Sequence, residues 1–171
     1  MANYTAADVK ALRERSGAGM MDCKGALDEA NGDIEKAMEL LRVKGLKGVA
    51  KREGRSTSNG LVVARVNGGV GVLIELACET DFVAKAEKFI ALADTVADAV
   101  AASGAESLEA ALNAPLNGKT VAESINDEAA IMGEKVELRK VEVVKDAAVD
   151  AYLHRTSADL PPQVGVLVAY S

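Results

Sequence analysis

The chain has 171 residues, of which 49% are hydrophobic and 27% charged, so it can fold around a core of its own. Its formal net charge of −6 argues against nucleic acid as the main partner. Two distant cysteines form neither a disulfide framework nor a pair of metal ligands. The chain has neither a signal-like N-terminus nor an apolar run of membrane-spanning length, so we expect a cytoplasmic protein.

Three short helices are predicted in the first 45 residues. Thr5 is a good N-cap, and Asp8 three residues later makes an acidic variant of the capping box. Gly17 is a natural end for the first helix, and Asn31-Gly32 for the second. Asp33 then suits the start of a third helix, which we expect to end before Gly45. Connections this short predict a compact three-helix bundle.

The stretch 42–55 is strongly basic, with six basic residues and one acidic residue. It is interpreted as a charged linker or a frayed extension of the third helix. A solvated connector is favoured over a phosphate-binding arm.

After residue 60 the pattern becomes typical of strands. Asn67-Gly68-Gly69 separates two apolar runs and predicts a β-hairpin. The alternation of apolar and polar residues over 135–144 predicts an edge-type strand. The helices expected in this part span 82–102, 106–113 and 120–132.

An internal echo connects the two halves of the sequence. Val70–Ile74 reads VGVLI and Val164–Val168 reads VGVLV, each as the second arm of an expected hairpin. The echo predicts a duplicated α+β unit whose second copy is truncated. Such a truncation would leave an unpaired strand edge and an uncovered apolar face.

No group of residues resembles an active site. The NGKT at 117–120 lacks the first glycine and the preceding strand of a P-loop, and Thr120 suits a helix N-cap instead. His154 is the only histidine, and it lies in no triad or zinc-ligand pattern. We expect His154 to end a strand and to face water or a partner. The chain is therefore expected to be a binding protein without cofactor or metal, not an enzyme.

The segment CETDFVAK at 78–85 contains one of only two phenylalanines. On one continuous helix, Phe82 and Phe89 differ by about 20° around the axis, which favours a core position for Phe82. Thr80 and Asp81 suit a helix start that would instead project Phe82 outward. Composition and spacing leave both alternatives open.

Several motifs together resemble bacterial translation elongation factor Ts, particularly that of actinobacteria. They are GAGMMDCK within the N-terminal helices, TDFVAK in the middle, and YLHRTSADLPPQVGVLV at the end. The resemblance implies a nucleotide-exchange factor for elongation factor Tu, which promotes GDP release by displacing Mg²⁺ without binding either itself. The alternative is a docking fragment or interaction module without exchange activity.

The resemblance also implies a domain division within an α+β fold. Residues 1–54 would form a ubiquitin-associated-like three-helix domain with the basic linker. Residues 55–146 would form the first α+β core half, and 147–171 the beginning of a truncated second half. Members of the family usually continue further, so the C-terminal truncation is part of the expectation.

Two groups of partner-binding residues are implied by the same resemblance. Arg13, Met20 and Met21 match the contact of the three-helix domain with the GTPase domain of elongation factor Tu. For Met20, core packing is at least as well supported, because Met20, Cys23 and Leu27 have helical spacing.

The second group is centred on the TDFV motif. Thr80, Asp81, Phe82 and Val83 match the segment that presses between helices near the partner's magnesium site. His154 matches a contact residue in the second half of the core.

Overall fold

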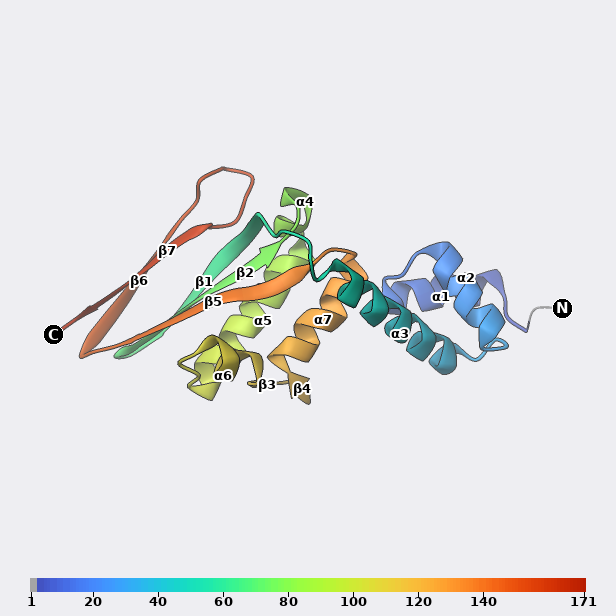
Figure 1. Ribbon diagram of the computed structural model, residues 1–171, viewed down its shortest axis with the longest axis horizontal. Helices are drawn as coiled ribbons and strands as arrows, with labels where there is room; N and C mark the ends of the chain where they lie inside the picture. The colour runs from blue at the N-terminus through green and yellow to red at the C-terminus, as the bar shows by residue number, and fades with distance from the viewer. Residues whose placement is uncertain (1–2) are drawn as a thin grey trace.

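The computed structural model describes residues 3–171. The molecule is elongated, with a helical bundle at the N-terminal end and a β-hairpin at the C-terminal end (Figure 1). Between these ends lies a sheet covered by helices. The fold is α+β, as predicted.

Three helices form the bundle, and local signals define their ends. The Thr5 side chain accepts a hydrogen bond from the Asp8 amide and Asp8 bonds back to the Thr5 amide, which completes the predicted capping box. Gly17 ends the first helix in the left-handed conformation, with φ 69°. The helices are α1 (Ala6–Ser16), α2 (Met20–Glu29) and α3 (Ile34–Arg52).

The third helix is longer than predicted. It continues through Gly45 to Arg52, so the predicted end before Gly45 is wrong and most of the basic stretch is an extension of the third helix, the second of the two alternatives. The reason is tertiary packing, because α3 lies along α7 (Val121–Met132). A Cβ added at Gly45 would lie 2.8 Å from the Cβ of Ala130, so the glycine permits this close approach.

The central sheet is antiparallel and has the strand order β1-β2-β5. The predicted hairpin is present, with Asn67 paired to Val70 and Gly68 at φ 59° in the turn. The predicted alternating strand is β5, which lies at an edge. The strands are β1 (Asn59–Asn67), β2 (Val70–Cys78) and β5 (Val136–Lys145).

Helices cover one face of this sheet and bury the main core (Figure 1). Gly104 ends α5, and Thr120 caps α7, as the NGKT interpretation predicted; Glu123 completes a capping box there. These helices are α4 (Asp81–Ala84), α5 (Glu87–Ser103), α6 (Leu108–Leu112) and α7, with the small hairpin β3 (Pro115–Leu116) and β4 (Lys119–Thr120) between α6 and α7.

The C-terminal hairpin packs on the other face of the sheet. It consists of β6 (Ala148–His154) and β7 (Val164–Tyr170), so both copies of the echo are second arms of hairpins. Added Cβ atoms would lie 3.2 Å from Leu167 at Gly71 and 2.7 Å from Leu73 at Gly165. Each glycine thus contacts the leucine two residues after the other glycine, which gives the two hairpins a reciprocal packing.

The helix predicted over 82–102 is interrupted, and the interruption decides the two alternatives for Phe82 against the core position that spacing favoured. Ala86 has an extended ψ of 135°, which separates α4 from α5. The break allows Ala84 and Phe89 to be buried together in the core. Phe82 is 73% exposed, whereas Phe89 is fully buried.

Candidate partner-binding site

The four-residue helix α4 presents Phe82 to solvent. Thr80 is its N-cap, and the Thr80 Oγ1 accepts a hydrogen bond of 3.3 Å from the Val83 amide. Asp81 lies in the first turn, where the helix dipole favours a carboxylate. Ala84 is buried and Val83 packs against the core, so one side of the helix is anchored while Phe82 projects from the other.

Lys85 lies beside Phe82 and Asp81 of this helix. Its Nζ is 4.6 Å from the centroid of the Phe82 ring and 3.4 Å from Asp81 Oδ2. The cation therefore touches the ring face and partly neutralises Asp81. Both contacts are at the surface, where a partner can replace them at little cost.

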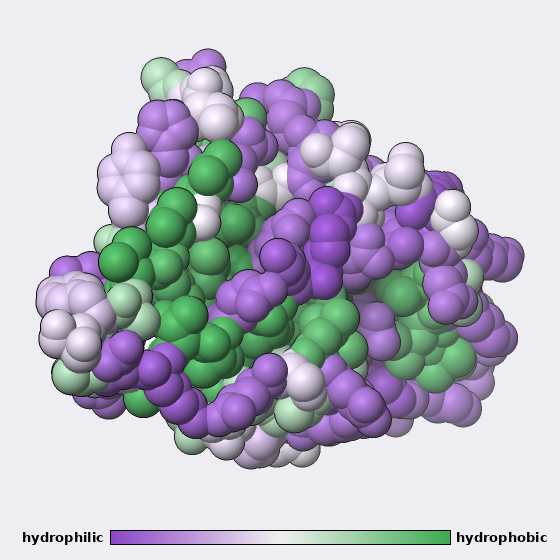
Figure 2. All heavy atoms as spheres, turned by 60° about the vertical axis from the view of Figure 1, so that its left-hand side comes forward, coloured by the Kyte–Doolittle hydropathy of each residue, from purple (hydrophilic) through white to green (hydrophobic). Residues whose placement is uncertain are grey.

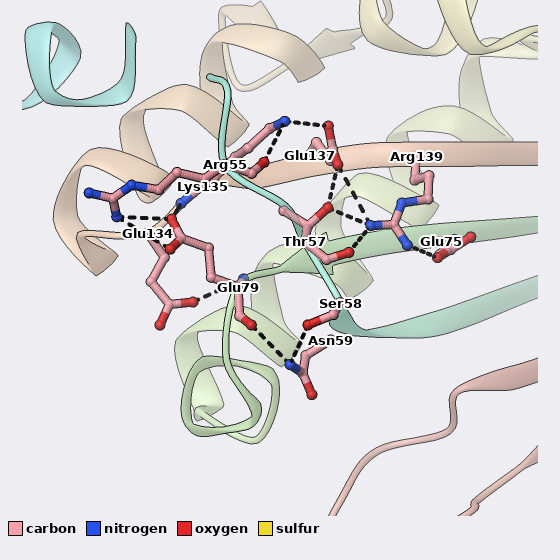
Figure 3. Close-up of polar contacts among 10 residues, drawn as sticks. All are labelled: Arg55, Thr57, Ser58, Asn59, Glu75, Glu79, Glu134, Lys135, Glu137 and Arg139. Carbon is pink, nitrogen blue, oxygen red and sulfur yellow. Dashed lines mark hydrogen bonds and ion pairs between the residues drawn. The ribbon is translucent and has the colours of Figure 1, made fainter. Parts of the chain in front are cut away.

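Glu134, at the start of the turn between α7 and β5, holds the chain just before α4. Its Oε2 accepts hydrogen bonds from the amides of Glu79 at 3.1 Å and Thr80 at 3.0 Å. Its Oε1 accepts the Thr80 hydroxyl proton at 2.5 Å. Figure 3 shows the Glu134 side chain reaching the backbone amide of Glu79.

Glu79 in turn bonds to the segment that carries Glu134 (Figure 3). Its carboxylate accepts a hydrogen bond of 2.6 Å from the Lys135 amide and two of 3.3 Å from Arg55. The Lys135 amide first, and then the Arg55 charge, lower the pKa of Glu79 below its ordinary value. The Asn59 side-chain amide donates to the Glu79 carbonyl at 2.9 Å. Two carboxylates thus cross-link the β2–α4 and α7–β5 junctions.

A neighbouring polar cluster fixes the segment that connects α3 to β1 (Figure 3). Thr57 is buried, donates its hydroxyl proton to Glu137 and accepts hydrogen bonds from Arg139. Burial is the largest influence on Glu137 and raises its pKa, but the Thr57 hydroxyl and Lys135 together bring that pKa below the ordinary value. This cluster keeps a partly buried charge paired and ties β5 to the entry of β1.

The thiol in the same region is chemically quiet. Cys78 is buried, and burial raises its pKa to about 12. Its Sγ donates to the Thr80 carbonyl at 3.3 Å. A thiol in this state has little thiolate at neutral pH, so Cys78 supports the turn and offers no nucleophile.

Arg13, Met20 and Met21 lie on the bundle, at the other end of the molecule from the β6–β7 hairpin (Figure 1). Met21 is 76% exposed and Met20 48% exposed. The helical spacing of Met20, Cys23 and Leu27 supported a core position for Met20, but only Cys23 and Leu27 are fully buried. Met20 is the first residue of α2 and lies outside the buried core.

His154 ends strand β6, as predicted, and is exposed. Its Nδ1 lies 2.9 Å from the Tyr152 hydroxyl, on the same side of the strand. The next residue, Arg155, lines a groove of about 320 Å³ that is also lined by Lys85. The structure therefore brings Arg155 to the groove beside Lys85, whereas the His154 ring lies with Tyr152 on the other side of β6. Arg13, Met20 and Met21 form a separate surface.

Two findings concern residues 3–171 as a whole. No helix in this range is long and apolar enough to cross a membrane. Nor does this range contain three or more His, Cys, Asp or Glu side chains grouped to hold a metal ion.

Comparison with known proteins assigns the family. A sequence profile described as Elongation factor TS matches residues 79–171, the part that contains α4, the Glu134 turn and His154. The chain belongs to the elongation factor Ts family. Elongation factor Ts of Paenarthrobacter aurescens (strain TC1) is 64% identical over 169 residues, which cover 99% of this chain and 61% of the relative.

Other actinobacterial members of the family are similar to the same degree. Elongation factor Ts of Leifsonia xyli subsp. xyli (strain CTCB07) is 63% identical over 172 residues, covering 100% of this chain and 62% of the relative. The chain thus spans about three fifths of the length of the elongation factor Ts relatives it matches.

Several residues that shape the site were not predicted from the sequence. Glu134 and Lys135 bond to residues more than 50 positions away, and no periodic pattern marks such contacts. Lys85 had a detectable signal, because it lies four residues after Asp81 and such pairs are neighbours on a helix.

Proposed function

We propose that this chain binds elongation factor Tu and promotes release of its GDP, with Thr80–Val83 as the working segment. The observation that carries the proposal is the exposure of Phe82 on a short helix whose base is fixed by hydrogen bonds. A large apolar ring held in water by a rigid support is typical of a residue that binds a partner.

The mechanism is a coupling between two ligands of the GTPase. The factor binds a state of elongation factor Tu that holds GDP and Mg²⁺ poorly, so each ligand lowers the affinity of the other by the same factor. Burial of the Phe82 ring is worth about 1.5–3 kcal/mol. If this energy is gained only in the nucleotide-poor state, it supplies a shift of about ten- to a hundredfold.

Asp81 has a supporting role in this proposal. It lies next to Phe82 and is paired with Lys85 at 3.4 Å, an exposed interaction that is easily broken. Once the helix is inserted, the carboxylate competes electrostatically around the partner's Mg²⁺. No bond is made or broken, so the activity is not enzymatic.

The remaining contacts serve docking. Arg13, Met20 and Met21 offer an exposed surface on the bundle, and Met side chains adapt well to a partner. His154 offers a further exposed contact at the end of β6, beside Tyr152. The second candidate is a docking fragment without exchange activity, which is favoured by the chain's spanning about 61% of its relatives.

An RNA-binding role for the basic stretch has weaker support. Three of its cations are already paired with carboxylates: Arg42 with Glu39, Lys44 with Asp22, and Arg55 with Glu79. Phosphate-driven binding would weaken steeply with added salt.

The deciding experiment measures release of a fluorescent GDP analogue from elongation factor Tu, with and without this chain. We expect accelerated release, and we expect the Phe82→Ala variant to lose most of it while keeping the wild-type circular dichroism. Binding without acceleration would support the docking-fragment alternative. Absence of both binding and release would overturn the proposal.

A further inference from the structure

The Glu134 carboxylate uses both of its oxygens on one short segment. Oε2 accepts two backbone amides, and Oε1 accepts the Thr80 hydroxyl at 2.5 Å. Carboxylates that accept several such bonds hold their donors strongly, because each bond is charge-assisted. All three bonds lie immediately before α4, which carries Phe82.

The Thr80 hydroxyl transmits this constraint into the helix. A hydroxyl has one proton to donate and lone pairs that accept. The proton goes to Glu134, which leaves a lone pair for the Val83 amide at 3.3 Å. Glu134 thereby sets the orientation of the hydroxyl that caps α4.

The helix itself is too short to maintain this geometry alone. It has four residues, and isolated helices of that length are unstable in water. Its fixed points are the buried Ala84 at one end and the Glu134 bonds at the other. Phe82 lies between these points, so its direction depends on both.

We propose that Glu134 is a positioning residue, which fixes the direction in which Phe82 is presented to the partner. This inference rests on the proposed function and deepens it, because it assigns part of the exchange activity to a side chain outside the TDFV motif. Without Glu134, Phe82 remains exposed but samples several directions, and its insertion slows.

The first test reports on the direction of residue 82 without any partner. The chain has no Trp, so Phe82→Trp introduces a single reporter. We expect Glu134→Ala in this background to increase the fast component of the time-resolved fluorescence anisotropy, and Glu134→Gln to restore most of the order. Glu142→Ala is the matched control, because Glu142 lies within β5 and, among residues 3–171, pairs only with Lys140, at 3.1 Å.

The second test measures exchange in a double-mutant cycle. We expect Glu134→Ala to lower the maximal rate of GDP release about tenfold, and Glu134→Gln to recover most of that loss. In the Phe82→Ala background, Glu134→Ala is expected to cause almost no further loss, because it acts through the ring. A purely structural effect would add to the Phe82→Ala loss in full.

The outcomes separate this inference from the proposed function. Unchanged anisotropy in Glu134→Ala, or additive losses in the cycle, would overturn the positioning role while leaving exchange by the wild-type chain intact. If the wild-type chain does not accelerate release, the proposed function fails. In that case the anisotropy of the Trp reporter still tests whether Glu134 fixes the direction of residue 82.

Discussion

Phe82 and Phe89 are seven residues apart, yet one side chain is 73% exposed and the other fully buried. On a continuous helix they would share a face. The extended Ala86 between α4 and α5 separates their directions, so the chain's two phenylalanines have different roles. Phe89 belongs to the core, and Phe82 lies on a surface where little of its area contributes to folding.

This contrast gives the first prediction. Phe89→Ala leaves a cavity in the main core and is expected to lower the free energy of unfolding by about 3–5 kcal/mol. Phe82→Ala is expected to change it by less than about 0.5 kcal/mol, as is usual for surface substitutions. Urea unfolding followed by circular dichroism measures both. A similar loss of stability in the two variants would mean that Phe82 packs in solution.

The second prediction concerns the contact between α3 and α7. Gly45→Ala places a methyl group 2.8 Å from the Ala130 Cβ, which forces the helices apart. We expect a loss of about 1–2 kcal/mol in the free energy of unfolding despite the better helix propensity of alanine.

Gly25 is the matched control for that substitution. It lies within α2, and apart from its chain neighbours and the nearby backbone of its own helix, no atom of residues 3–171 lies within 4 Å of an added Cβ. Gly25→Ala is expected to stabilise the chain by about 0.5–1 kcal/mol through helix propensity alone. Equal stabilisation by both variants would show that α3 does not pack on α7.

Whether a feature could be predicted from the sequence depends on how far apart in the sequence its interacting residues lie. The caps at Thr5, Asp33 and Thr120 were predictable, because a cap depends on residues three positions away. The break at Ala86 was not, because no glycine or proline marks it and burial of Ala84 and Phe89 produces it.

The candidate site shows the same division. The TDFV segment was found from its resemblance to a family, but sequence spacing favoured the wrong environment for Phe82. The Glu134–Thr80 bonds join residues 54 positions apart and leave no local signal. Contacts of this kind exist only because the fold brings the β2–α4 and α7–β5 junctions together.

The third prediction is a pH dependence caused by Glu79. Its pKa in the folded chain is lowered from 4.5, so the folded state favours the charged form more than the unfolded state does. The stability that Glu79 contributes is therefore present above about pH 4.5 and is lost as the pH falls through the lowered pKa.

Glu79→Gln tests this dependence. We expect the variant to be less stable than the wild type at pH 7, because the charged acceptor for the Lys135 amide and Arg55 is gone. The difference should shrink as both proteins are titrated toward pH 3 in urea unfolding experiments. A difference that stays constant with pH would contradict the assignment to this carboxylate.

The fourth prediction concerns His154. Its Nδ1 is paired with the Tyr152 hydroxyl at 2.9 Å, which orients the ring at the end of β6. We expect His154→Ala to weaken binding to elongation factor Tu about fivefold or more, with the maximal release rate little changed. Titration of the release rate against the concentration of the chain separates these quantities. A fall in the maximal rate alone would place His154 with Phe82 in the exchange step.

The last prediction concerns the outer face of the C-terminal hairpin, which Figure 2 shows as an area of apolar side chains. Along β6 and β7 the side chains alternate, so Leu167 faces the central sheet while its neighbours Val166 and Val168 face solvent. The exposed members of this face are Tyr152, Val164, Val166, Val168 and Tyr170. An apolar surface of this kind on a sheet with free edges favours association between copies.

Replacing the two central valines tests this consequence. Val166→Thr with Val168→Thr keeps the branched shape that suits a strand but adds hydroxyl groups to the face. We expect light scattering to show less self-association of the double variant at high concentration, with unchanged circular dichroism. Leu167→Thr is the control, because Leu167 packs against Gly71 and its loss should loosen the hairpin instead. Equal scattering by the wild type and the double variant would show that this face does not drive association.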